Sequence, residues 1–167
     1  ITKANAIFQN ENIGLAMKRF NCFKVDVHSI PDGNVKEQYV RKCGFYFYDP
    51  KGEIVGKPLV GKRAVSMSAF NSAVERIWSK VFTLAVKDYQ KQMKAVLDGF
   101  DKVDVKKQAI DRDQASLAKK PNPAKARSVA KKQAEMDKQR KEVEALELEV
   151  IAKCSLREEY LPNAENA

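Results

Sequence analysis

Lys119-Lys120-Pro121-Asn122-Pro123 is the stretch that decides the fold, because it holds the only prolines between Ser68 and Tyr160. A proline costs a helix interior about 3 kcal/mol, so the proline-free flanks permit two long helices. Pro121 ends the first helix, since the residue before a proline is pushed out of the helical region. Asn122 and Pro123 suit the next start, as N-cap and first helical residue. The sequence therefore predicts a helical hairpin over residues 68–160 with its turn at 121–123.

The first arm carries a narrow apolar seam that is typical of a coiled coil. Its members recur at alternating steps of four and three, and the row continues beyond a lysine at position 107: Phe82, Val86, Tyr89, Met93, Val96, Phe100, Val103, Ile110 and Leu117. Between Ser68 and Lys120 the only glycine is Gly99, and Ser72-x-x-Glu75 matches a capping box. One continuous helix is therefore predicted, starting at Ser72 or a turn earlier at Ser68.

The second arm has a weaker seam. Apolar residues repeat in sevens at Val129, Met136, Val143 and Val150, but Gln133 and Arg140 occupy intermediate positions. Two helices joined by a short turn pack antiparallel. Because so thin a seam rarely holds two isolated helices, we expect a third contact, from the N-terminal body or from another copy of the chain.

The N-terminal region alternates with a period of two and holds six of the seven glycines. Its predicted strands are residues 23–28, 39–48, 53–60 and 62–67, joined by turns at 30–34 and 49–52, with Pro58 placing the third strand at an edge. The predicted fold is α+β: an antiparallel meander of three to four strands packed on the base of the hairpin. The predicted domains are a body at 1–67, the hairpin at 68–160 and a disordered tail at 161–167.

Composition predicts a non-catalytic protein. No phosphate-binding glycine loop occurs, His28 is the single histidine, and Cys22, Cys43 and Cys154 are too widely separated for a zinc motif. We therefore expect no cofactor, no metal and buried free thiols in a reducing cytoplasm. The first 20 residues lack the apolar run of a signal peptide, and no stretch approaches the ~20 apolar residues of a membrane span.

The positive charge is concentrated around the predicted turn. The chain carries +9, and residues 106–132 hold nine Lys and Arg against two Asp, which leaves +7. These nine are the predicted phosphate contacts: Lys106, Lys107, Arg112, Lys119, Lys120, Lys125, Arg127, Lys131 and Lys132. Two alternatives stay open: the lysines solvate an exposed coiled coil, or residues 118–130 stay flexible until a ligand binds.

A second set of candidate contacts lies in the N-terminal region. Arg41, Lys42, Lys62 and Arg63 would extend the phosphate contact, and Tyr46 and Tyr48 would stack on unpaired bases. The alternative is that Phe45 and Phe47 are buried while Tyr46 and Tyr48 are partly exposed sheet residues.

Two functions follow from these patterns. The first is a non-catalytic nucleic-acid-binding protein that contacts DNA or RNA phosphates through a basic hairpin tip. The second is a protein-interaction or assembly factor, compatible with a viral or phage origin, whose arms pair with another copy in a homodimer or with a large partner. Neither function involves a membrane.

Overall fold

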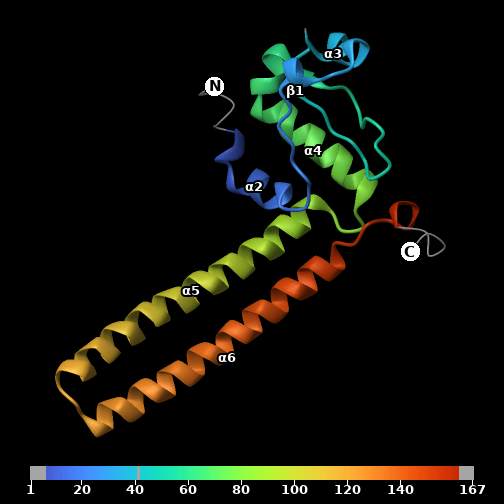
Figure 1. The fold of residues 1–167 in the computed structure, drawn as a ribbon. Coiled ribbons are helices and arrows are strands. Elements are labelled where there is room, and N and C mark those ends of the chain that lie inside the picture. The colour runs from blue at the N-terminus through green and yellow to red at the C-terminus, as the bar shows by residue number, and fades with distance from the viewer. Residues whose placement is uncertain (1–6, 41, 162–167) are drawn as a thin grey trace. The chain divides into compact units, whose positions relative to one another are not determined.

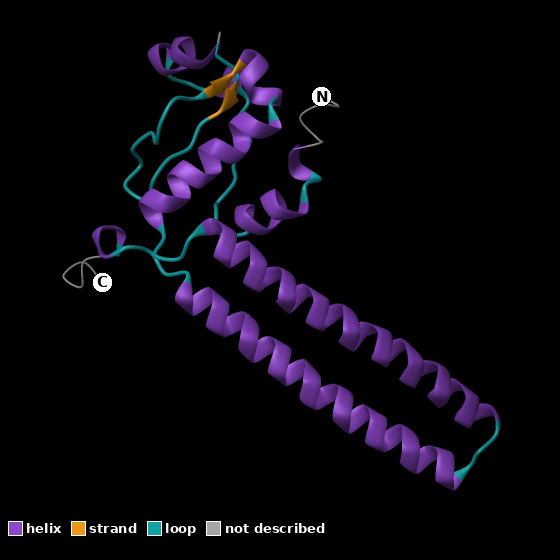
Figure 2. Cartoon of the chain, turned by 180° about the vertical axis from the view of Figure 1, so that it is seen from behind, coloured by secondary structure: helices purple, strands orange, loops and turns teal. Residues whose placement is uncertain are grey.

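A computed structural model describes residues 7–40 and 42–161, and these are mostly helical (Figures 1 and 2). The chain divides into two compact units. The hairpin unit is Lys91–Lys153, and the body unit combines the residues up to Gln90 with those from Cys154 onward. The boundaries at 67 and 160 that the sequence suggested stay predictions, and all but the first residue of the proposed tail lies outside the described residues.

The predicted helical hairpin is confirmed. Helix α5 (Val86–Lys119) and helix α6 (Pro123–Lys153) run antiparallel, as Figure 2 shows. Buried seam residues from both helices form one apolar cluster, against which Leu117 also packs: Val103, Ile110, Val129 and Met136. Gly99 permits close approach, because a Cβ at this position would lie 2.8 Å from a Cγ of Val143.

Asn122 starts α6 as the sequence predicted. Its side-chain Oδ1 accepts hydrogen bonds from the backbone N–H groups of Ala124 (3.0 Å) and Lys125 (3.1 Å). Its carbonyl accepts the first intrahelical bond, from the Ala126 N–H. The turn is therefore held by an N-cap and not by side-chain packing alone.

Replacing Asn122 with alanine is expected to destabilise the hairpin by about 1 kcal/mol, because two backbone N–H groups lose their side-chain acceptor. Urea unfolding followed by far-UV circular dichroism measures this change. Asn122→Asp is the control, since aspartate caps equally well; equal stability of the Ala and Asp variants would contradict the capping role.

The first arm is two helices, which corrects the prediction of a continuous one. Helix α4 spans Met67–Val81 and α5 begins only at Val86. The N-cap of α4 is Ser66, whose Oγ accepts a hydrogen bond from the Ala69 N–H at 3.3 Å. The helix therefore starts neither at Ser72 nor at Ser68, the two predicted positions.

The linker between α4 and α5 leaves the helical conformation at Phe82, and its backbone groups find partners outside the helical hydrogen-bond pattern. Phe82 forms a β-bridge with Leu156, and the Thr83 N–H donates to the Ser155 carbonyl at 3.0 Å. The Trp78 indole Nε1–H donates to the Leu84 carbonyl at 2.7 Å. Two of these partners, Ser155 and Leu156, lie more than 70 residues along the chain, and the third is the side chain of Trp78. The sequence contains no proline or glycine at the break that could have indicated it.

The sheet is much smaller than predicted. Within the described residues it has two strands, β1 (Gly44–Phe45) and β2 (Leu59–Val60), paired antiparallel in the register Gly44 to Val60. An isolated bridge between Tyr48 and Ile54 extends the pairing around the turn at 49–52, which the sequence did predict.

The other predicted strands take different conformations. Residues 23–26 are non-regular with Phe23 85% exposed, residues Val27–Ser29 form the 3-10 helix η1, and Gly61–Val65 forms η2. Residues Gly33–Val40 form α3, because the Asp32 carboxylate accepts from the Asn34 and Val35 N–H groups and caps a helix where a turn was expected. Local side-chain capping here outweighs the strand-like alternation.

The body unit has an aromatic core on one face of α4. Phe70 packs edge-on against Phe45 at 5.1 Å and Phe47 at 5.6 Å between ring centroids. Further along α4, Trp78 contacts Phe82 at 4.5 Å and Tyr89 at 4.9 Å. Helix α2 (Glu11–Met17) buries Ile13 and Leu15 in the same unit, and the C-terminal 3-10 helix η3 (Glu158–Tyr160) buries Tyr160.

Candidate nucleic-acid interface

The two halves of α6 differ in how many of their basic side chains form ion pairs with acidic residues of the same helix. In the half that follows Glu135, basic side chains pair with glutamates four residues away: Lys138 with Glu142, Arg140 with Glu144, and Lys153 with Glu149. Between Asp113 and Glu135 the chain has six Lys and Arg and no Asp or Glu. The turn end of the hairpin therefore lacks the local pairing that keeps the rest of α6 near neutrality.

Three of the nine predicted phosphate contacts are engaged within the hairpin. Lys106 Nζ lies 2.6 Å from the Gln139 Oε1 and 3.6 Å from a Glu135 carboxylate oxygen. Lys125 and Lys132 both reach the Asp113 carboxylate, at 3.4 and 2.9 Å. These contacts connect α5 with α6 beside the apolar seam, so their first role is to hold the helices together.

The other six are exposed and, within residues 7–40 and 42–161, have no carboxylate partner: Lys107, Arg112, Lys119, Lys120, Arg127 and Lys131. We call the four nearest the turn, Lys119, Lys120, Arg127 and Lys131, the tip cations. Lys107 lies twelve residues before Lys119, about 18 Å along the helix axis. Four of the predicted contacts thus lie within about 12 Å of the turn along the helix axes, and two lie further along α5.

Asp113 is the acid that holds two of the lysines. Hydrogen bonds from Lys132, and then from Lys125, hold the pKa of its carboxyl below the ordinary value of 3.8, with burial opposing them. A lowered folded-state pKa adds stability that is present above the unfolded pKa and is lost as the pH falls through the folded value. The cross-helix pairing is therefore complete at neutral pH and weakens only below about pH 4.

Asp113→Asn is expected to raise the affinity for a single-stranded nucleic acid by about tenfold, because it removes one negative charge and releases Lys125 and Lys132 for phosphate. Fluorescence anisotropy at fixed salt measures this change. Asp111→Asn is the matched control, since Asp111 is exposed and pairs with no lysine among the described residues. An equal gain from both variants would mean that net charge alone, and not the release of the two lysines, sets the affinity.

The candidate cations of the body unit lie next to the two short strands, just before β1 and just after β2. Lys42 is exposed, and Lys62 and Arg63 lie exposed in η2, whereas Arg41 is outside the described residues. Among the described residues, none of these three cations forms an ion pair with a carboxylate. They stay predictions as phosphate contacts.

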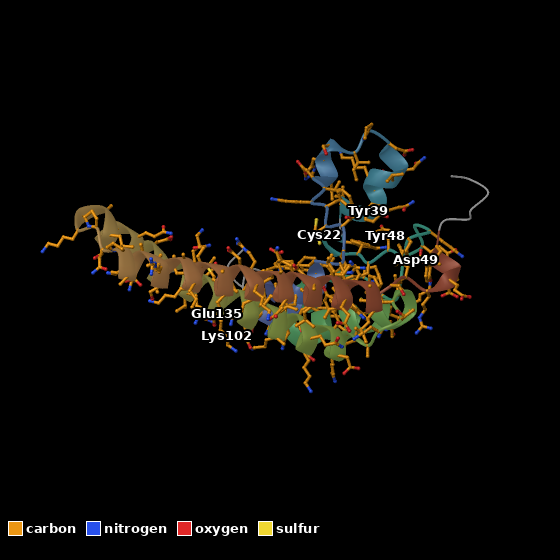
Figure 3. All side chains as sticks on the ribbon, turned by 90° about the horizontal axis from the view of Figure 1, so that it is seen from below. Cys22, Tyr39, Tyr48, Asp49, Lys102 and Glu135 are labelled. Atoms are coloured by element: carbon orange, nitrogen blue, oxygen red, sulfur yellow. The ribbon has the colours of Figure 1, made fainter. Side chains whose placement is uncertain are left out.

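Tyr39 and Tyr48, labelled in Figure 3, form a tyrosine cluster with Tyr46. The Tyr39 and Tyr48 hydroxyls are 3.3 Å apart, and the Tyr39 and Tyr46 rings meet edge-on at 5.1 Å. The hydrogen bond with Tyr39 raises the pKa of Tyr48 to about 12. On the opposite side of the strand, Phe47 is buried and Phe45 is half-buried, as the structural alternative expected. Because the rings meet edge to face, they do not form a ready parallel stack for bases.

Sequence reasoning missed a buried ion pair in the body unit. The Asp49 carboxylate, labelled in Figure 3, is buried near the turn at 49–52. It accepts from Lys80 Nζ at 2.8 Å and from the Tyr160 hydroxyl at 3.4 Å. The bond from Lys80 is the main cause that lowers the pKa of Asp49, and it raises the pKa of Lys80. These partners are 31 and 111 residues away from Asp49, so no sequence motif marks them.

Two of the three cysteines differ from expectation. Cys22 and Cys43 are exposed and only Cys154 is buried, because residues 21–24 and 42–44 do not enter the core. Among the described residues, no group of three or more His, Cys, Asp and Glu side chains is placed to hold a metal ion. No described helix combines the length and apolar character that a membrane span needs.

Comparison with protein-family models, with curated proteins and with solved structures finds no match to this chain.

Proposed function

We propose that this chain is a non-catalytic nucleic-acid-binding protein that contacts phosphates through the turn end of its helical hairpin. The observation that carries the proposal is the run of 21 residues between Asp113 and Glu135, with six basic side chains and no acidic one. Four of these six, the tip cations, are exposed without a carboxylate partner among the described residues. Neutralising phosphates with such side chains releases counterions and favours binding.

Solvation alone is a weaker account of this charge. A surface that only needs to stay hydrated does so with alternating charges, as α6 shows beyond residue 135. At the turn, Arg127 and Lys131 are like charges at an i,i+4 spacing, which destabilises a helix by about 0.2–0.5 kcal/mol. A bound polyanion would attract both side chains and so offset the repulsion between them.

The body unit would contribute secondary contacts. Lys42, Lys62 and Arg63 are exposed cations that can reach phosphates, and Tyr48 is the most exposed ring of the tyrosine cluster. We assign them a smaller share of the affinity, because none of them is gathered into a cluster like that of the tip cations. Arg41 belongs to the same proposed set.

The test is a titration of the full chain, at low salt, with labelled single-stranded DNA, RNA and duplex DNA of equal length. Sub-micromolar binding of at least one of them is the expected result. Absence of binding at low salt would overturn the proposal and leave the lysines as solvating groups. Trp78, the single tryptophan, is buried in the body unit, so its intrinsic fluorescence monitors folding in the same sample.

A second candidate function is self-association through the hairpin. Val105 of α5 and Leu148 of α6 are 67% and 68% exposed, so these two apolar side chains are accessible to another copy of the chain. The seam residue Val96, by contrast, is fully buried within the chain and is not available to another copy. Light scattering distinguishes a monomer of 18.9 kDa from a dimer of twice that mass. A dimer that Val105→Asp or Leu148→Asp dissociates would favour this second candidate.

A further inference from the structure

The turn of the hairpin encloses a shallow apolar hollow. Its volume is about 410 Å³, within the range of small-ligand sites of ~300–1,000 Å³. Five of its six lining residues are apolar, and they come from the end of α5, the turn and the start of α6: Leu117, Ala118, Pro121, Asn122, Pro123 and Ala126. One lining residue, Leu117, also packs against the buried cluster of the hairpin, whereas the other five lie outside that cluster.

Cations flank the hollow on both sides in sequence. Lys119 and Lys120 lie between the lining residues Ala118 and Pro121, and Arg127 follows the lining residue Ala126. All three are exposed and belong to the tip cations. An apolar surface and exposed cations that are its immediate sequence neighbours suit a flat apolar ring attached to anionic groups.

The single polar lining residue offers little for reading a base edge. The Asn122 Oδ1 already accepts two backbone hydrogen bonds as the N-cap of α6. A ring in the hollow would thus be held by apolar contact and would not be selected by hydrogen-bond pattern. Contact of this kind tolerates every base, because each base presents a flat face. The lining holds no aromatic side chain, so the contact differs from the base–aromatic stacking of other single-strand binders.

We propose that the hollow takes one unpaired nucleobase of a single-stranded nucleic acid, with the neighbouring phosphates held by the tip cations. This inference rests on the proposed nucleic-acid binding and specifies its ligand class. In a single strand each base is free and is flanked by two phosphates, which matches an apolar surface between cations. A duplex keeps its bases stacked and would have to unstack one before it could enter.

The experiment compares two labelled oligonucleotides of about 12 nucleotides, within the site sizes of single-strand binders. One is oligo-thymidine, and the other has the same phosphates with abasic sugars. The full chain is expected to bind oligo-thymidine about tenfold more tightly than the abasic strand. Ala126→Leu fills the hollow and should remove this preference, whereas Ala130→Leu, at an exposed α6 position outside the lining, should keep it.

The outcomes separate this inference from the proposed function. Equal binding of the two strands, with a salt dependence in both, would overturn the base site and leave phosphate contact at the tip intact. Absence of binding to either strand would overturn both. An acidic, leucine-containing peptide that binds the wild-type chain but not Ala126→Leu, while the strands show no base preference, would assign the hollow to a protein partner instead.

Discussion

Reversal of the four tip cations to glutamate is expected to weaken single-strand binding by about a thousandfold or more at low salt. Each substitution removes an attraction to phosphate and adds a repulsion, so the loss exceeds that of neutral substitutions. The variant carries Lys119→Glu, Lys120→Glu, Arg127→Glu and Lys131→Glu. Fluorescence anisotropy with oligo-thymidine measures the affinity, and far-UV circular dichroism verifies that α5 and α6 are retained.

The matched control reverses four exposed lysines elsewhere in the hairpin unit and changes the net charge equally: Lys91, Lys102, Lys138 and Lys141. Lys102, labelled in Figure 3, belongs to α5 beyond the basic turn region. The control is expected to keep most of the affinity, because its positions lie outside residues 106–132. If control and tip variant lost affinity to the same degree, net charge would account for binding and the turn would have no special role.

Trp78→Ala is expected to lower the free energy of unfolding of the body unit by about 3–5 kcal/mol. Trp78 is fully buried, packs against Phe82 and Tyr89, and holds the α4–α5 linker through its bond to the Leu84 carbonyl. Natural domains are stable by about 5–15 kcal/mol, so this change removes a large share of the total. Urea unfolding followed by far-UV circular dichroism gives the difference in midpoint.

Trp78→Phe isolates the hydrogen bond from the packing. Phenylalanine keeps an aromatic ring in the core but removes the Nε1–H donor, which leaves the Leu84 carbonyl without that partner. The contribution of the lost hydrogen bond is expected to be about 0.5–1.5 kcal/mol, added to the smaller packing loss of the ring change. If Trp78→Ala cost no more than Trp78→Phe, the aromatic cluster would not be the main source of stability in this unit.

The hairpin could be predicted from sequence because its determinants are local. Pro121, Asn122 and Pro123 specify where one helix ends and the next begins, and the cap geometry agrees with that expectation. The seam residues repeat at fixed intervals, so their burial in one cluster follows from helix periodicity. Both signals are contained within a few turns of helix.

The body unit was predicted less well because distant contacts override its local patterns. Phe82 was predicted as the first seam residue, yet it lies outside the helices and pairs with Leu156. Phe23 and Val25 alternate as in a strand, but no neighbouring strand pairs with them among the described residues, and both are exposed. Alternation indicates a strand only where a partner strand is present.

In the candidate site, too, the features set by local sequence could be predicted and those set by contacts between the helices could not. The concentration of cations near the turn is a property of the sequence, and the structure places four of them together. The register of α5 against α6 decides which cations form contacts between the helices. It places Lys125 and Lys132 next to Asp113, and Lys106 next to Gln139. Register between helices is not readable from charge counts, so these three side chains were grouped with the exposed ones.

The salt dependence of single-strand affinity tests the central claim most directly. For wild-type chain and oligo-thymidine, the logarithm of the association constant should fall linearly with the logarithm of salt concentration. With four tip cations on phosphates, the slope should be about −3, since each contact contributes about −0.7 on a single strand. The tip-reversed variant should lose that slope. A wild-type slope near zero, or one that the reversal leaves unchanged, would contradict phosphate binding at the hairpin turn.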